Sequence, residues 1–105
     1  MLATFDGPTR AIRCACALRD LAKESGIEIR GGLHSGECIL KDRDVQGIAV
    51  HIASRVSDLA GDSEVLVSGT VRDLSVGSDI RFIDKGAQPL KGLDGEWRMY
   101  AVSNA

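Results

Sequence analysis

Apolar residues change spacing several times along this chain of 105 residues, and the alternation restricts the folds that the chain can adopt. Residues 9–24 carry apolar side chains three and four positions apart, which predicts a helix that ends near Ser25-Gly26. The same spacing predicts a helix over residues 46–60. A third, shorter helix is expected through Leu74, with Ser68 or Thr70 able to cap it. The first helix would bury the following stripe: Ala11, Ile12, Ala15, Leu18, Leu21 and Ala22.

Between these helices the pattern is that of strands. Five segments have strand character, which gives the order β-α-β-α-β-α-β-β: residues 2–5, 27–40, 64–68, 81–84 and 97–102. Residues 41–44 and 86–95 are expected to form a charged turn and a turn-rich connection. Alternation of this kind predicts an α/β or α+β fold with helices packed on a sheet. The first strand has no partner before it in the sequence, so an open sheet edge is expected there.

Glycines 31, 32 and 36 interrupt the second strand segment, and the sequence around them matches no phosphate-binding or dinucleotide-binding motif. They are therefore interpreted as positions where another backbone packs closely. The alternating Trp97, Met99 and Ala101 are interpreted as a core strand. His34 and Cys38 are four residues apart on one predicted strand and would share a face, but two ligands alone are a weak signal for zinc.

Composition excludes several classes of protein. A length of 105 residues suits one domain, and a formal net charge of −2 argues against a nucleic-acid binder while leaving room for a small anionic ligand. No apolar run approaches the length of a membrane span, and no signal peptide is visible. Three cysteines without a framework spacing predict core or half-buried thiols in a reducing compartment, so a cytoplasmic location is expected.

Five segments together resemble one family. They are LATFDGPTRAI, IRGGLHSGECI, DVQGIAVHIASRV, EVLVSGTVRDL and PLKGLDGEWRMYAV, and they occur in this order in class III adenylate/guanylate cyclase catalytic domains. The resemblance covers nearly the whole chain. It implies a ferredoxin-like α/β sandwich, with active sites formed between two such domains. The implied reaction is attack of the ribose 3′-hydroxyl of ATP on the α-phosphate, giving cyclic AMP and pyrophosphate, with Mg²⁺ or Mn²⁺ held by two aspartates.

The resemblance also assigns roles to four residues. Asp44 falls where the nucleobase is read, since a carboxylate can accept a hydrogen bond from an exocyclic amine. Arg55 falls at the arginine that offsets charge on the α-phosphate in the transition state. His51 takes the place where many relatives have an asparagine that positions the ribose, and Lys91 falls at the contact with the terminal phosphates. Four residues apart on a helix, His51 and Arg55 would face one way.

The same comparison implies that part of the family domain is missing. The two metal-binding aspartates and the base-reading lysine of the family precede the LATF-like strand, and Asp6 follows that strand and is no substitute. Residues 1–105 are therefore expected to be an N-terminally truncated cyclase domain that retains no metal ligands and is inactive alone. Expected partners are ATP and a second copy, as a homodimer or a strand-exchanged oligomer.

Simpler interpretations remain open. Asp44 can be a solvated turn residue, His51 and Arg55 an exposed helix face, and Lys91 an ordinary loop residue. A non-catalytic dimerisation module or a nucleotide-binding module is then the alternative function.

Overall fold

The computed structural model describes residues 2–4, 7–34, 37–42, 52–90 and 93–104, and the structural statements below concern these residues. They form three helices and one six-stranded sheet in the strand order β1-β3-β2-β4-β6-β5. Neighbouring strands are antiparallel except β2 and β4, which are parallel. The elements are, in chain order, β1 (Leu2–Thr4), α1 (Pro8–Glu24), β2 (Ile29–His34), β3 (Glu37–Asp42), α2 (Ile52–Asp58), β4 (Val65–Ser68), α3 (Gly69–Leu74), β5 (Arg81–Pro89) and β6 (Glu96–Asn104).

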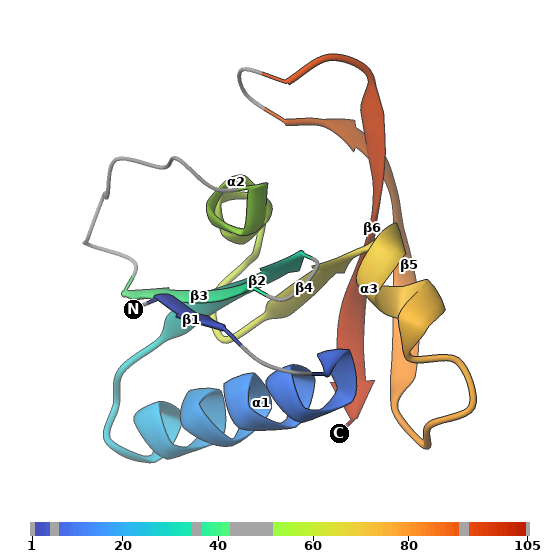
Figure 1. Ribbon diagram of the computed structural model, residues 1–105. Coiled ribbons are helices and arrows are strands. Elements are labelled where there is room, and N and C mark those ends of the chain that lie inside the picture. The colour runs from blue at the N-terminus through green and yellow to red at the C-terminus, as the bar shows by residue number, and fades with distance from the viewer. Residues whose placement is uncertain (1, 5–6, 35–36, 43–51, 91–92, 105) are drawn as a thin grey trace.

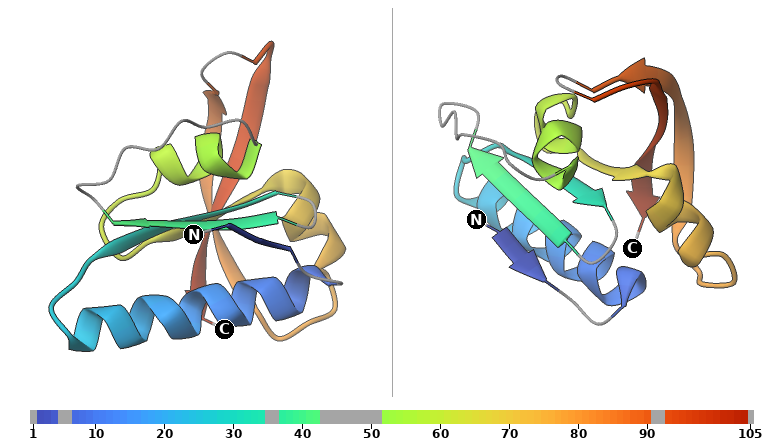
Figure 2. Two further views of the ribbon diagram at one scale, coloured as in Figure 1. Left: turned by 60° about the vertical axis from the view of Figure 1, so that its left-hand side comes forward. Right: turned by 45° about the horizontal axis from the view of Figure 1, so that its top comes forward.

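The sheet lies between two helical layers, with α1 along one face and α2 on the other (Figure 1 and, edge-on, the left view of Figure 2). The alternation along β4 explains this arrangement. Val65 and Val67 join the core on the α1 side, whereas Leu66 between them joins the core on the α2 side. An α+β sandwich of this kind was predicted from the sequence and is confirmed.

Helix α1 begins as the sequence predicts. Pro8 occupies the first turn after the extended Gly7, and the backbone N–H of Ser25 bonds to the carbonyl of Ala22 at the other end. Its buried face is narrower than predicted, because the side chain of Leu21 is 62% exposed. The buried residues of α1 are Ala11, Ile12, Ala15 and Cys16.

The predicted single strand over residues 27–40 is wrong. The segment folds back on itself as two antiparallel strands, β2 and β3, in which His34 pairs with Glu37 and Gly31 with Leu40. The second strand continues through Lys41 and Asp42, which had been predicted as a turn. Backbone pairing between the two arms outweighs the local turn preference of these charged residues.

Strands β5 and β6 are also longer than predicted. Residues 86–89 had been predicted as part of a turn-rich connection, but they extend β5 to Pro89. A register shift between Asp84 and Ala87 accommodates the extra length, with Gly86 at a φ of +85°. Pro89 is tolerated because β5 is an edge strand.

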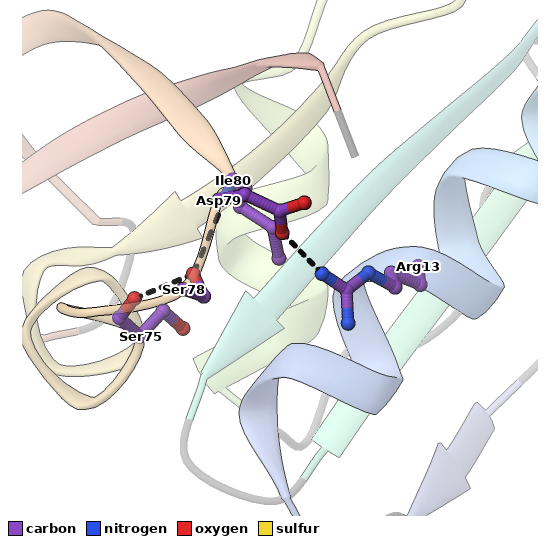
Figure 3. A network of polar contacts seen from close by, with 5 residues as sticks. All are labelled: Arg13, Ser75, Ser78, Asp79 and Ile80. Carbon is purple, nitrogen blue, oxygen red and sulfur yellow. Dashed lines mark hydrogen bonds and ion pairs between the residues drawn. The ribbon is translucent and has the colours of Figure 1, made fainter.

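A polar network fixes the connection between α3 and β5 (Figure 3). The Ser78 hydroxyl donates to the Ser75 carbonyl at 2.6 Å and accepts from the Ile80 backbone N–H at 3.4 Å. Beside it, Arg13 on α1 donates to the carboxylate of Asp79. The connection is thereby tied to the helix that covers the same face of the sheet.

Candidate functional site

Helix α2 rests directly on the backbone of β2. A Cβ atom added to Gly32 would lie 2.3 Å from the carbonyl oxygen of Ala53 and 2.3 Å from the backbone nitrogen of Ser57. Only glycine allows so close an approach, which confirms the interpretation of this glycine as a backbone-packing position. This contact between Gly32 and the backbone of α2 fixes the distance of the helix from the sheet.

Arg55 is carried by this helix and points away from the sheet. Ala53, Val56 and Ser57 form the buried face of α2, and Arg55 lies about 200° around the helix from Ala53. Its side chain is half-buried, and among the described residues its guanidinium makes no hydrogen bond or ion pair. A fixed positive charge without an internal partner is available to a negatively charged ligand.

Asp44, His51 and Lys91 lie outside the described residues, so their assigned roles stay predictions. Two of their neighbours in the sequence are described. Ile52 follows His51, Leu90 precedes Lys91, and both pack in the α2-side core beside Val56. Ile52 and Leu90 therefore lie on the same side of the sheet as α2, the helix that carries Arg55.

Lys41 and Asp58 were not among the predicted site residues, yet they hold α2 in place. The Lys41 ammonium, on β3, donates to the Asp58 carboxylate at 2.7 Å and to the Ser54 carbonyl at 3.4 Å. The Lys41 side chain is only 13% exposed, whereas that of Asp58 is 46% exposed, so the ion pair is buried on the lysine side and open to water on the carboxylate side. Alternation along β3 puts Lys41 on the same face as Ile39, which is the only sequence signal for this contact.

His34 lies on the α2 side at the end of β2. Its Nδ1 is 2.8 Å from the Ser68 hydroxyl, and its ring packs edge-on against Trp97 at a centroid distance of 5.6 Å. Burial lowers the pKa of His34, and the Glu37 carboxylate partly offsets this. Ser68 is at the N-cap of α3 but makes no side-chain cap, because its hydroxyl is engaged by His34 instead.

The prediction that His34 and Cys38 share a face of one strand is wrong. They belong to different strands, and Cys38 packs in the α1-side core, where burial raises the pKa of its thiol to about 12. All three cysteines are free, and only Cys14 is partly exposed, as the sequence predicted.

Strand β6 is a core strand, as its alternating pattern predicted. Three of its residues pack in the α2-side core: Trp97, Met99 and Ala101.

The described residues do not suit the divalent metals that the resemblance implies. Among residues 2–4, 7–34, 37–42, 52–90 and 93–104, no group of three or more His, Cys, Asp or Glu side chains is arranged to hold a metal ion. The chemistry that this part of the chain can supply is that of a positioned cation, Arg55.

Solved structures share this fold. An adenylate/guanylate cyclase/hydrolase from Silicibacter pomeroyi superposes with a TM-score of 0.70 at 22% identity, over 96% of this chain and 64% of that chain. The adenylyl cyclase CyaB of P. aeruginosa gives a TM-score of 0.57 at 26% identity, over 85% of this chain and 51% of that chain. The fold is thus that of the nucleotide cyclase domains.

Sequence comparison agrees. A Rhizobium meliloti protein named "Putative adenylate cyclase 3" is 30% identical over 103 residues, which is 90% of this chain and 18% of that protein. An uncharacterized protein of Mycobacterium tuberculosis (strain H37Rv) is 37% identical over 97 residues, or 87% of this chain and 34% of that protein. No protein-family model matches the chain. In fold and in sequence, the chain is thus similar to adenylate/guanylate cyclase domains, which confirms the resemblance carried by the five sequence segments.

The chain spans from about a fifth to a third of the length of these two relatives. None of the helices in the described part of the chain has the length and apolar character that crossing a membrane requires.

Proposed function

We propose that this chain supplies nucleotide-binding residues to an adenylate cyclase site, in which ATP is converted to cyclic AMP and pyrophosphate. The observation that carries the proposal is Arg55: a fixed cation on the outer side of a firmly seated helix, without an internal partner among the described residues. Such a cation can stabilise negative charge that develops on a phosphate. His51, four residues earlier in the sequence, is proposed to contact the ribose, and Lys91 the terminal phosphates.

ATP is the proposed substrate because Asp44 can accept a hydrogen bond from the exocyclic amine of adenine. Mg²⁺ or Mn²⁺ is the proposed metal for turnover, with ligands outside the described residues. We therefore expect the 105-residue chain to bind ATP but to form little cyclic AMP on its own. The three free cysteines are consistent with a cytoplasmic location.

ATP binding and cyclic AMP formation in the presence of Mn²⁺ test the proposal, with Arg55→Ala as the probe. Loss of a charge-assisted phosphate contact should weaken ATP binding about ten- to hundredfold. Arg10→Ala is the matched control, because Arg10 is an exposed helix arginine on the opposite side of the sheet. Equal ATP affinity in the two variants would contradict the role of Arg55. Cyclic AMP formation that Arg55→Ala abolishes would show that the chain holds metals itself.

A dimerisation module is the second candidate, and one exposed side chain favours it. Ile83 on β5 is 54% exposed and pairs with Ala101, whose side chain packs in the α2-side core. Paired residues share a face of the sheet, so Ile83 presents an apolar surface on the side that carries Arg55. A second copy covering this face would remove the Ile83 side chain from water. Sedimentation analysis tests this, since a monomer at micromolar concentration, unchanged by Ile83→Glu, would exclude the dimer there.

A further inference from the structure

We propose that Lys41 is a positioning residue that keeps Arg55 available to nucleotide by holding Asp58 away from it. The proposal rests on the function proposed above for Arg55. It concerns the arrangement of three charges on and around α2, two of which the sequence does not single out.

Asp58 is the natural internal partner of Arg55. The two residues are three positions apart on α2, a spacing at which side chains of opposite charge meet on a helix surface. Asp58 is also the only acidic residue among the described residues of α2. Left to itself, this helix would therefore pair its arginine with its own aspartate, and the arginine would lose its availability to phosphate.

Lys41 prevents that pairing. Its ammonium approaches from β3 and lies 2.7 Å from the Asp58 carboxylate, while a second contact at 3.4 Å reaches the Ser54 carbonyl one turn earlier. Asp58 and Ser54 lie on the flank of α2 that faces β3, because they are four residues apart. The carboxylate is thus turned toward the sheet, whereas Arg55 points outward.

The strength of this contact favours Lys41 over Arg55 as the partner of Asp58. The Lys41 side chain is 13% exposed and would leave a charge nearly buried if Asp58 turned away. The half-buried Arg55 side chain keeps part of its surface in water with or without a partner. The same lysine also fixes the orientation of α2, so removing it has two separable effects on Arg55: a shift of the helix and capture by Asp58.

A double substitution separates these effects. In Lys41→Met, Asp58 becomes free to pair with Arg55, and a pair at this spacing should weaken ATP binding about two- to threefold. In Lys41→Met/Asp58→Asn the competing carboxylate is gone, so ATP affinity should rise above that of Lys41→Met by the part of the loss that capture by Asp58 causes. If Lys41 acted only by docking the helix, the second substitution would restore nothing. Lys85→Met is the matched control, because it removes one positive charge from the pair between Lys85 and Glu64 elsewhere on the chain.

The Nε–Hε NMR signal of Arg55 in ¹⁵N-labelled protein provides a readout that needs no nucleotide. It should shift in Lys41→Met, return in the double variant and stay unchanged in Lys85→Met. It should also stay unchanged in Asp58→Asn alone, a variant that tests the proposal even if Lys41→Met does not fold. A shift in Asp58→Asn alone, or no return in the double variant, would overturn the proposal. If the signals follow the expected pattern but no variant binds ATP, the proposed function fails and the role of Lys41 in separating the two charges stands.

Discussion

Replacing Gly32 by alanine should destabilise the fold more than any other glycine-to-alanine change among the described residues. An added Cβ would lie 2.3 Å from two backbone atoms of α2, and real Cβ atoms essentially never approach closer than 3.0 Å. Helix α2 must therefore move away from β2 by at least about 0.7 Å. A gap of that size loses a quarter to a half of the dispersion energy across the contact, and overpacking of this kind typically costs about 1–3 kcal/mol.

Two other glycines provide matched controls. At Gly31 the nearest neighbours of an added Cβ are side-chain methyl groups, at 3.0 Å from Leu40 and 3.2 Å from Val65, which can adjust. At Gly69, the first residue of α3, the nearest atom is 3.7 Å away, so alanine should be neutral or stabilising by up to about 1 kcal/mol. Urea denaturation at equilibrium measures all three free energies of unfolding. A free energy for Gly32→Ala within about 0.5 kcal/mol of that for Gly69→Ala would refute the reasoning.

Two further predictions concern titratable groups. Because burial lowers the pKa of His34, the folded state binds a proton at this residue less readily than the unfolded state. The free energy of unfolding should therefore fall as the pH drops below about 6.5. The variant His34→Gln should flatten that decline in urea titrations at several pH values. If the free energy of unfolding falls equally with pH in His34→Gln, other titratable groups cause the decline. At pH 8 the native chain should expose one reactive thiol to Ellman's reagent, that of Cys14, and three in guanidinium chloride, since Cys16 and Cys38 are buried with raised pKa values. Rapid reaction of two native thiols would contradict the packing of α1 on the sheet.

Much of this fold could be predicted from apolar spacing, because the helices and strands bury opposite faces with different periods. The β2–β3 hairpin was missed for a physical reason. Gly31 and Gly32 carry no side chains, so the alternation that marks a strand is absent where the first arm runs. The length of β5 was missed because Gly86 and Pro89 favour turns locally, whereas pairing with β6 and a bulge retain them in a strand.

The candidate site was less accessible to sequence reasoning. Resemblance to a family identified Arg55, and the structure places it on the outer side of α2. Lys41 was missed because the run Lys41-Asp42-Arg43-Asp44 has the signature of a solvated turn, which hides its alternation with Ile39. Its partner Asp58 is 17 residues away in the sequence. Such a contact depends on how far β3 extends beneath the helix, which tertiary pairing decides.

Contacts with the sheet hold the part of α2 that carries Arg55, Ile52–Asp58. In proteins most of the stability of a helix comes from packing of this kind, so the position of Arg55 depends on what α2 rests on. The backbone of Gly32 sets the height of the helix, and Lys41 fixes the flank that faces β3. Substitutions in β2 and β3 should therefore change nucleotide affinity without touching the ligand. Their effects should be larger than those of equally conservative changes on α1, which packs on the opposite face of the sheet.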